Sequence, residues 1–248
     1  MHKITLYAFL IMKNTTTFKN INGNVNSVSL KFTGKFFNLC KGFYNAITPK
    51  YSFNVKPPQE PCVYLCRHLN LHGALTIEKC STFDLSPYVY HVFANRKTCF
   101  LHFYNYTFSK RLNKSKLFAL LPSFLCSLFV PYLCSKAQII PVYRNNCEAF
   151  KTIKASMTAL KSGRSLIIFP NVDYTSKNDS GSREIYGGFL CLEKLYFKQT
   201  NKHLKFIPLT IDDELKTVTE KPPVVFSGSV PFEKEFIKIQ KKIADAIF

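Results

Sequence analysis

The sequence predicts an α/β fold, in which one domain has a mostly parallel central sheet flanked by helices and follows an aromatic, basic helical segment. Residues 62–66 form a run that is apolar on both of its alternating faces, which is typical of a strand buried inside an α/β sheet. Residues 138–143, 147–162 and 165–169 alternate as strand, helix and strand, and this order favours parallel pairing. The 248 residues contain no internal repeat and no linker rich in Pro, Gly or Ser, so we expect one domain.

The chain is strongly basic. It contains 34 Lys and Arg residues against 15 Asp and Glu residues, which gives a formal net charge of +19. A surface of this kind attracts polyanions, which are either nucleic acids or the anionic face of a cytoplasmic membrane. A biased genome composition would also produce a chain rich in Lys and Asn, without any functional meaning.

The nine cysteines are odd in number and scattered, and several lie in apolar runs. This pattern predicts a reducing compartment rather than a framework of disulfides. Cys62, Cys66, His68 and His72 have side chains that can bind zinc, but only one residue separates Cys66 from His68. A zinc finger needs a loop of about a dozen residues between its two ligand pairs. We therefore expect neither a metal site nor a bound cofactor.

Residues 1–60 are expected to form a basic, aromatic, membrane-facing segment, and residues 61–248 the α/β domain. A short apolar run near the start is too short to span a bilayer, so it lies in a membrane interface or is a frayed end. Lysines then alternate with aromatic residues, and a helix is expected over residues 29–46. This pattern suits a lipid interface and also stacking on single-stranded nucleic acid. The pair Pro57-Pro58 breaks regular structure before the domain begins.

The first half of the expected domain contains two strands and a long apolar stretch. The strand over 62–66 is followed by a helix that includes 74–79, and by a second strand over 88–93 that is rich in β-branched and aromatic residues. Residues 115–134 are the most apolar stretch, and two prolines interrupt it. A buried helix pair and an apolar hairpin that dips into one leaflet both fit. We predict a helix that packs partly on the core and partly on lipid.

The second half continues the alternation. Beyond the strand at 165–169, we expect a helix that begins near Phe189, strands over 205–211 and 224–226, and an amphipathic helix over 234–247. Pro208 lies within one of these strands, which predicts an edge or bulge position. The polar loop 171–186 is long enough to be a lid or binding loop, or an ordinary surface loop.

His68 follows the strand at 62–66 almost directly. Open α/β sheets place their chemistry just past the carboxyl ends of strands, so His68 is the candidate general base. His72, His91 and His102 are readily interpreted as structural residues, and position favours His68 over them. The sequence has no G-x-S-x-G elbow, no P-loop and no G-x-G-x-x-G fingerprint, which argues against a serine hydrolase, a P-loop NTPase and a dinucleotide enzyme.

Four blocks of the sequence occur in an order that resembles a known family. They are His68 at its strand end, the IIPVYR segment 139–144, the strand that ends in Phe169-Pro170, and the FIPL segment 206–209. Together they span about 61–211, and the chain resembles the glycerolipid acyltransferases, in particular a divergent bacterial branch of the lysophosphatidic acid (1-acylglycerol-3-phosphate) O-acyltransferases. The GGFLCLEKLY stretch from Gly187 adds to this resemblance.

The resemblance implies an activity and roles for particular residues. The activity is the transfer of a fatty acyl group from acyl-CoA or acyl carrier protein to a hydroxyl of a glycerol phosphate lipid such as lysophosphatidic acid. His68 would be the general base. Substrate-binding roles would belong to Arg144, which holds the acceptor phosphate, and to residues of the third block: Phe169, Pro170, Asn171 and Asp173.

Two motif positions depart from the family pattern. Gly73 stands where the family has an aspartate that orients the histidine. The third block reads Phe169-Pro170-Asn171-Val172-Asp173-Tyr174 in place of Phe-Pro-Glu-Gly-Thr-Arg. A weakened relative that binds anionic lipid without turnover is therefore one alternative function, and a basic nucleic-acid-binding protein is another. Our prediction is an acyltransferase at the cytoplasmic side of a membrane, peripheral or shallowly inserted, without a nucleic-acid partner.

Overall fold

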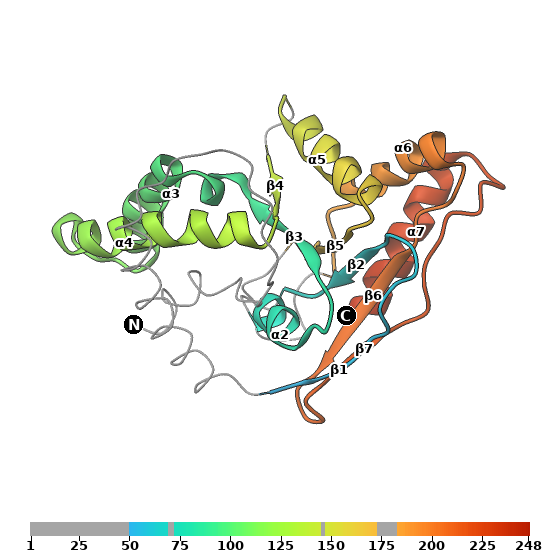
Figure 1. The fold of residues 1–248 in the computed structure, drawn as a ribbon, viewed down its shortest axis with the longest axis horizontal. Coiled ribbons are helices and arrows are strands. Elements are labelled where there is room, and N and C mark those ends of the chain that lie inside the picture. The colour runs from blue at the N-terminus through green and yellow to red at the C-terminus, as the bar shows by residue number, and fades with distance from the viewer. Residues whose placement is uncertain (1–49, 69–71, 145–146, 173–182) are drawn as a thin grey trace. The chain divides into compact units, whose positions relative to one another are not determined.

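A computed structural model of the chain describes residues 50–68, 72–144, 147–172 and 183–248 (Figure 1). The expected N-terminal segment lies outside the described residues as far as residue 49. The described part of the chain forms two compact units. A sheet unit contains Tyr51–His91 and Gln138–Phe248, and a helical unit contains Val92–Ala137 together with Lys50.

The sheet has seven strands in the order β1-β7-β6-β2-β5-β3-β4. Their bounds are β1 Ser52–Asn54, β2 Val63–Cys66, β3 Leu85–Tyr90, β4 Ile140–Val142, β5 Ser165–Ile168, β6 Phe206–Asp212 and β7 Thr217–Glu220. All neighbouring strands run parallel except β6 and β7, which are antiparallel. The predicted α/β fold class with a mostly parallel sheet is confirmed. Strand β1 lies before the expected boundary at residue 61 and pairs with β7 inside this sheet.

Helices cover both faces of the sheet (Figure 1). On one face lie α5 Ala149–Lys161, α6 Cys191–Thr200 and α7 Phe232–Ile247, with a short 3-10 helix, η4 Gly188–Leu190, before α6. On the other face lies α2 His72–Cys80. The expected helices over 74–79, over 147–162, from Phe189 and over 234–247 therefore correspond to α2, α5, η4 with α6, and α7.

Strand β2 is the centre of the core, as its two apolar faces predicted. All four of its residues are buried. Val63 and Leu65 join the apolar cluster beneath α5, α6 and α7, whereas Tyr64 and Cys66 join the cluster on the side of α2. The period of two along a strand therefore divides these side chains between the two layers of the core.

Strand β3 differs from its expected position. It spans Leu85–Tyr90 instead of 88–93, and residues His91–Ala94 form a 3-10 helix, η2. Residues 85–87 pair with β5 and residues 88–90 pair with β4, so both halves of the strand are held by neighbours. Pro87 lies inside the strand and pairs with Ile167 of β5. Long-range pairing therefore overrides the local preference of the sequence.

Pro208 lies in β6 in the interior of the sheet, beside an irregularity that makes its position tolerable. Leu209 pairs with Glu220, and Phe206 pairs with Val224 in an isolated bridge. These pairs are three residues apart along β6 but four apart along the other segment, which defines a β-bulge. The predicted bulge position is confirmed, while the expected strand at 224–226 is reduced to this bridge.

The helical unit consists of α3 Arg96–His102, a π-helical segment η3 Phe103–Arg111, and α4 Lys116–Lys136. Helix α4 is continuous through Pro122 and Pro131, so the predicted helix is confirmed and the helix pair and hairpin are not observed. It packs on α3 and η3 with one side, which includes the fully buried Ala119 and Ser123. In the described part of the chain it is the one helix long and apolar enough to cross a membrane, judged by length and composition alone.

Candidate active site at the carboxyl edge of the sheet

Strands β6, β2 and β5 are parallel neighbours, so their carboxyl ends meet at one edge of the sheet. His68 lies two residues past β2, Asn171 three residues past β5, and Asp213 directly after β6. Side chains that follow three separate strands are therefore brought to the same edge, where open α/β sheets place their binding sites.

His68 is held in place by the segment that follows β5. Its backbone N–H donates to Oδ1 of Asn171 at 2.8 Å, and its ring lies edge-on to the Phe169 ring, with 5.4 Å between centroids. Asn171 is buried, with 4% of its surface exposed. Burial lowers the pKa of His68 from 6.5 to about 4, so its ring is neutral at physiological pH. Three of the predicted site residues, His68, Phe169 and Asn171, therefore lie together.

The segment that contains Pro170 and Asn171 is closed by a short antiparallel pairing. The N–H of Tyr186 donates to the carbonyl of Pro170 at 2.8 Å, and that of Val172 donates to the carbonyl of Glu184 at 3.0 Å. Asn171 and Ile185 form a bridge between these two bonds. The two ends of the predicted loop 171–186 are thus paired. Asp173 lies outside the described residues.

Gly73 leaves no room for the aspartate of the family pattern. A Cβ atom added to Gly73 would lie 2.0 Å from the backbone oxygen of Arg67, which is far inside van der Waals contact. The N–H of Gly73 also donates to the carbonyl of His68 at 3.1 Å. This hydrogen bond holds the start of α2 close to the end of β2. Close backbone approach therefore requires glycine here.

A second polar cluster, which we call the Tyr51–His72–Asp213 cluster, lies at the same edge. Oδ1 of Asp213 accepts a hydrogen bond from the Tyr51 hydroxyl at 2.6 Å, and it lies 2.8 Å from Nε2 of His72. Burial alone would raise the pKa of Asp213, but hydrogen bonds from Tyr51 and His72 outweigh it and the pKa is lowered. Burial and the Asp213 carboxylate together raise the pKa of Tyr51, so the hydroxyl keeps its proton.

No pattern in the sequence marks this cluster. His72 alone is indicated there, as a zinc ligand or a structural residue, and no motif points to Tyr51 or Asp213. The two partners lie 21 and 141 residues from His72, so no local spacing marks them. The one signal that could have pointed to Asp213 is its place as a polar residue directly after a strand, where α/β sheets carry their binding sites.

Arg144 lies on the same edge but farther along it. It follows β4, the edge strand, and two strands, β5 and β3, lie between β4 and β2. At about 4.8 Å for each step between strands, β4 is roughly 14 Å from β2. The exposed Arg144 guanidinium lies over the Tyr90 ring at 4.9 Å, and Tyr143 stacks on His91 with 4.6 Å between centroids. The structure therefore does not bring Arg144 next to His68.

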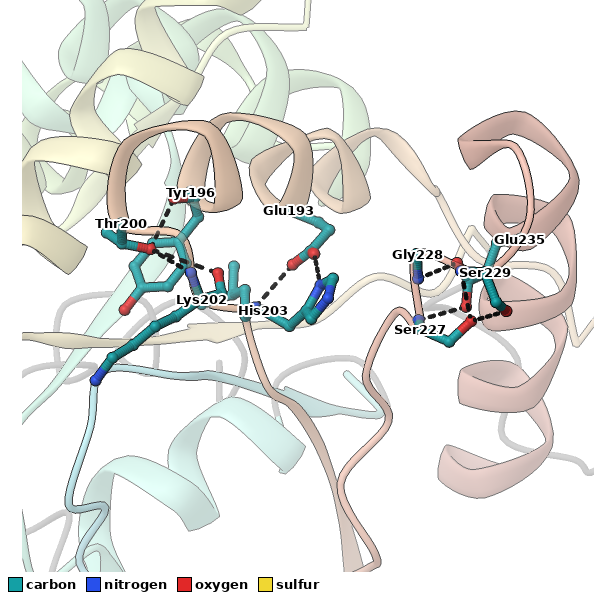
Figure 2. A network of polar contacts seen from close by, with 10 residues as sticks. Glu193, Tyr196, Thr200, Lys202, His203, Ser227, Gly228, Ser229 and Glu235 are labelled. Atoms are coloured by element: carbon teal, nitrogen blue, oxygen red, sulfur yellow. Dashed lines mark hydrogen bonds and ion pairs between the residues drawn. The ribbon is translucent and has the colours of Figure 1, made fainter.

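The opposite, amino edge of β6 also carries polar side chains, but they are tied to the backbone (Figure 2). Glu193, which is 3% exposed, accepts from the N–H of Leu204 at 2.7 Å and lies 2.6 Å from Nδ1 of His203. Glu235 accepts from the N–H groups of Ser227 and Gly228 at 2.6 and 3.2 Å. Both buried carboxylates therefore satisfy backbone donors, which gives this edge a structural role.

Within the described ranges, no group of three or more His, Cys, Asp or Glu side chains could hold a metal ion. Comparison with known protein families, curated proteins and solved structures finds no match.

Proposed function

We propose that this protein is an O-acyltransferase that moves a fatty acyl group from acyl-CoA or acyl carrier protein to a hydroxyl of a glycerol phosphate lipid. The main support is the hydrogen bond between the His68 backbone and the Asn171 side chain, which joins the first and third blocks of the resemblance. These blocks lie about a hundred residues apart in the sequence and follow neighbouring parallel strands. The resemblance to glycerolipid acyltransferases supplies the chemistry.

His68 acts as the general base in this proposal. The buried ring keeps its lone pair down to about pH 4, because burial lowers its pKa. It takes the proton of the acceptor hydroxyl while the hydroxyl oxygen bonds to the thioester carbonyl carbon. The carbon–sulfur bond then breaks and the thiolate leaves with the electron pair of that bond, without a covalent enzyme intermediate. Positioning and proton transfer carry the rate.

The remaining predicted residues bind substrate in the same proposal. Arg144 holds an anionic group of an extended acceptor through its guanidinium, and Phe169, Pro170, Asn171 and Asp173 line the pocket beside His68. The basic balance of the chain suits a phosphate-bearing substrate at an anionic surface.

Helix α4 supports a membrane location. Its exposed side carries several large apolar residues, of which Leu117 is 81% and Phe118 77% exposed. Lysines stand at both ends of the helix, at positions 116 and 136. An apolar face between cationic ends suits shallow insertion into an anionic membrane surface on its cytoplasmic side.

The test is acyl transfer to lysophosphatidic acid on anionic vesicles, with a panel of acyl-CoA and acyl carrier protein donors. We expect turnover by the wild type and a loss of about 10²–10⁴-fold in His68→Ala, the usual range for a lost general base. His102→Ala, a half-buried histidine in α3, is the matched control and keeps its activity. Circular dichroism establishes that each variant is folded.

A lipid-binding relative without turnover is the second candidate, and the backbone at Gly73 favours it because no orienting acid fits there. If folded wild-type protein binds vesicles but transfers no acyl group from any donor, the second candidate function replaces the acyltransferase proposal.

A further inference from the structure

The Tyr51–His72–Asp213 cluster is assembled from three elements that are distant in the sequence. Tyr51 precedes β1, His72 is the first residue of α2, and Asp213 follows β6. The side chains of His72 and Asp213 are 37% and 56% exposed, so the cluster is open to solvent and to a substrate. It lies on neighbouring strand ends with His68, because β2 and β6 are paired as far as Cys66 and Leu209.

Local hydrogen bonds hold each member in position. The side chain of Asp212 accepts from the N–H groups of Glu214 and Leu215 at 2.9 and 2.8 Å, which fixes the turn that carries Asp213. The N–H of Ser52 donates to the carbonyl of Lys216 at 2.8 Å and ties Tyr51 to the same turn. The hydrogen bond from the N–H of Gly73 to the carbonyl of His68 fixes the start of α2, which carries His72. Hydrogen bonds to the backbone therefore fix the chain positions of all three members.

The hydrogen-bond pattern determines which ring nitrogen of His72 is available. Asp213 has a lowered pKa and is ionised, so its Oδ1 can only accept hydrogen bonds. It accepts from the Tyr51 hydroxyl, which keeps its proton, and therefore the hydrogen on Nε2 of His72 must point to the carboxylate. The Nδ1 nitrogen remains for proton exchange with a substrate.

The charged groups around this cluster have both signs. Asp213 is the anionic partner of His72, and the Lys216 ammonium lies 5.3 Å from the centre of the Tyr51 ring. His68 has a different environment, because burial lowers the pKa of its ring and keeps it neutral. The two histidines at this edge of the sheet therefore differ in their polar surroundings.

We propose that His72, oriented by Asp213 and Tyr51, is the general acid that protonates the departing thiol sulfur during acyl transfer. This inference rests on the proposed function and assigns a second catalytic histidine to it. Asp213 and Tyr51 are positioning residues, because they act through His72.

The proton balance of the step is complete. His68 accepts the proton of the acceptor hydroxyl as the new carbon–oxygen bond forms. The carbon–sulfur bond breaks, and the imidazolium of His72 gives its Nδ1 proton to the sulfur, so that a neutral thiol leaves. His68 then releases its proton to water, and His72 takes one from water, which restores both rings.

The experiment compares two donors that carry the same acyl chain, acyl-CoA and an aryl thioester. An arylthiolate is a good leaving group and needs no proton. We expect His72→Gln to lower kcat about 100-fold with acyl-CoA and less than about threefold with the aryl thioester. Asp213→Asn and Tyr51→Phe should show the same donor dependence with smaller losses. They also provide the test if His72→Gln does not fold. Asp245→Asn, which removes an exposed carboxylate on α7, is the matched control and should leave both rates unchanged.

Losses of the same factor with both donors, or no loss with acyl-CoA, would overturn the role of His72 as an acid. His68→Ala serves as the contrast, because loss of the base lowers the rate with both donors. A wild type that transfers no acyl group from either donor would instead reject the proposed function itself, which separates the two failures.

Discussion

His68 shows how one buried ring links stability to pH. The unfolded chain protonates this histidine below its ordinary pKa of 6.5, whereas the folded ring takes a proton only near pH 4. The folded state therefore binds fewer protons between these values, and stability falls as the pH is lowered through this window. Below about pH 4 both states are protonated and this loss does not grow further.

We expect His68→Gln to remove this part of the pH dependence. A shift of this size corresponds to at most roughly 3 kcal/mol of unfolding free energy. Urea unfolding at pH 7 and at pH 4.5 measures the change in unfolding free energy between these two pH values. Carboxylates that titrate in the same range contribute equally to wild type and variant, so their contribution cancels when the two changes are subtracted. Equal losses of stability in the two proteins would contradict the assignment of a neutral, buried ring.

The conformation of the backbone at Gly73 leaves no space for a side chain. Alanine usually stabilises a helix relative to glycine by about 1 kcal/mol, but a Cβ at this position meets the Arg67 carbonyl at 2.0 Å. We expect Gly73→Ala to destabilise the protein by about 1–3 kcal/mol, because backbone must move.

The matched control for this change is Gly188→Ala, where an added Cβ meets nothing within 4 Å and the expected change is within about 0.5 kcal/mol. Urea midpoints of both variants give the comparison. Equal effects at the two positions would show that the turn at Gly73 relaxes freely. The same steric argument predicts that restoring the family aspartate at residue 73 does not raise activity.

At the scale of elements, α4 is unusual because most of its large apolar side chains lie on its exposed side, while its buried side includes small residues such as Ala119 and Ser123. Its buried side packs on α3 and η3, while its exposed side presents Leu117, Phe118 and Leu121. A helix side with several large exposed apolar residues is typical of an interaction surface.

We expect the double variant Phe118→Ser/Leu121→Ser to bind anionic vesicles about tenfold more weakly, because it loses apolar area that inserts into lipid. Vesicle sedimentation at a fixed salt concentration measures the partition coefficient. Leu215→Ser removes a side chain of similar exposure, 73%, in the turn after β6, and serves as the control. If the control weakens binding as much as the double variant does, α4 is not the inserting element.

At the scale of the sheet unit, the two edges of the sheet carry different kinds of polar group. The carboxyl edge carries His68 and the solvent-open Tyr51–His72–Asp213 cluster, whereas the amino edge near β6 carries buried carboxylates that bind backbone N–H groups (Figure 2). Groups that bind backbone support the fold, while open titratable groups at strand ends are suited to chemistry.

Glu193→Gln tests this division. The change replaces a charged acceptor of the Leu204 N–H by a neutral amide, and we expect a loss of about 1–3 kcal/mol in unfolding free energy. Acyl transfer per folded molecule should stay within about twofold of the wild type. Glu233→Gln on the exposed face of α7 should change neither quantity. A large loss of turnover in folded Glu193→Gln protein would place part of the active site at the amino edge.

The sequence by itself determined the fold class, the buried strand β2, the amphipathic helices and the position of His68 at a strand end. These features depend on periodicities of 2 and 3.6 residues, which are visible over short stretches of chain. The bulge beside Pro208 was also predictable, because proline lacks the N–H that a regular interior strand requires.

Tertiary structure alone decided the register of β3, the exclusion of a side chain at residue 73, and the meeting of Tyr51, His72 and Asp213. The register of β3 and the meeting of the three side chains depend on strand pairing between segments far apart in the sequence, which leaves no local spacing for a pattern to detect. The exclusion at residue 73 depends on the close approach of the backbone at Gly73 to Arg67. The order β6-β2-β5 brings three strand ends to one edge, and it is this order that places His68, Asn171 and Asp213 at the same edge of the sheet.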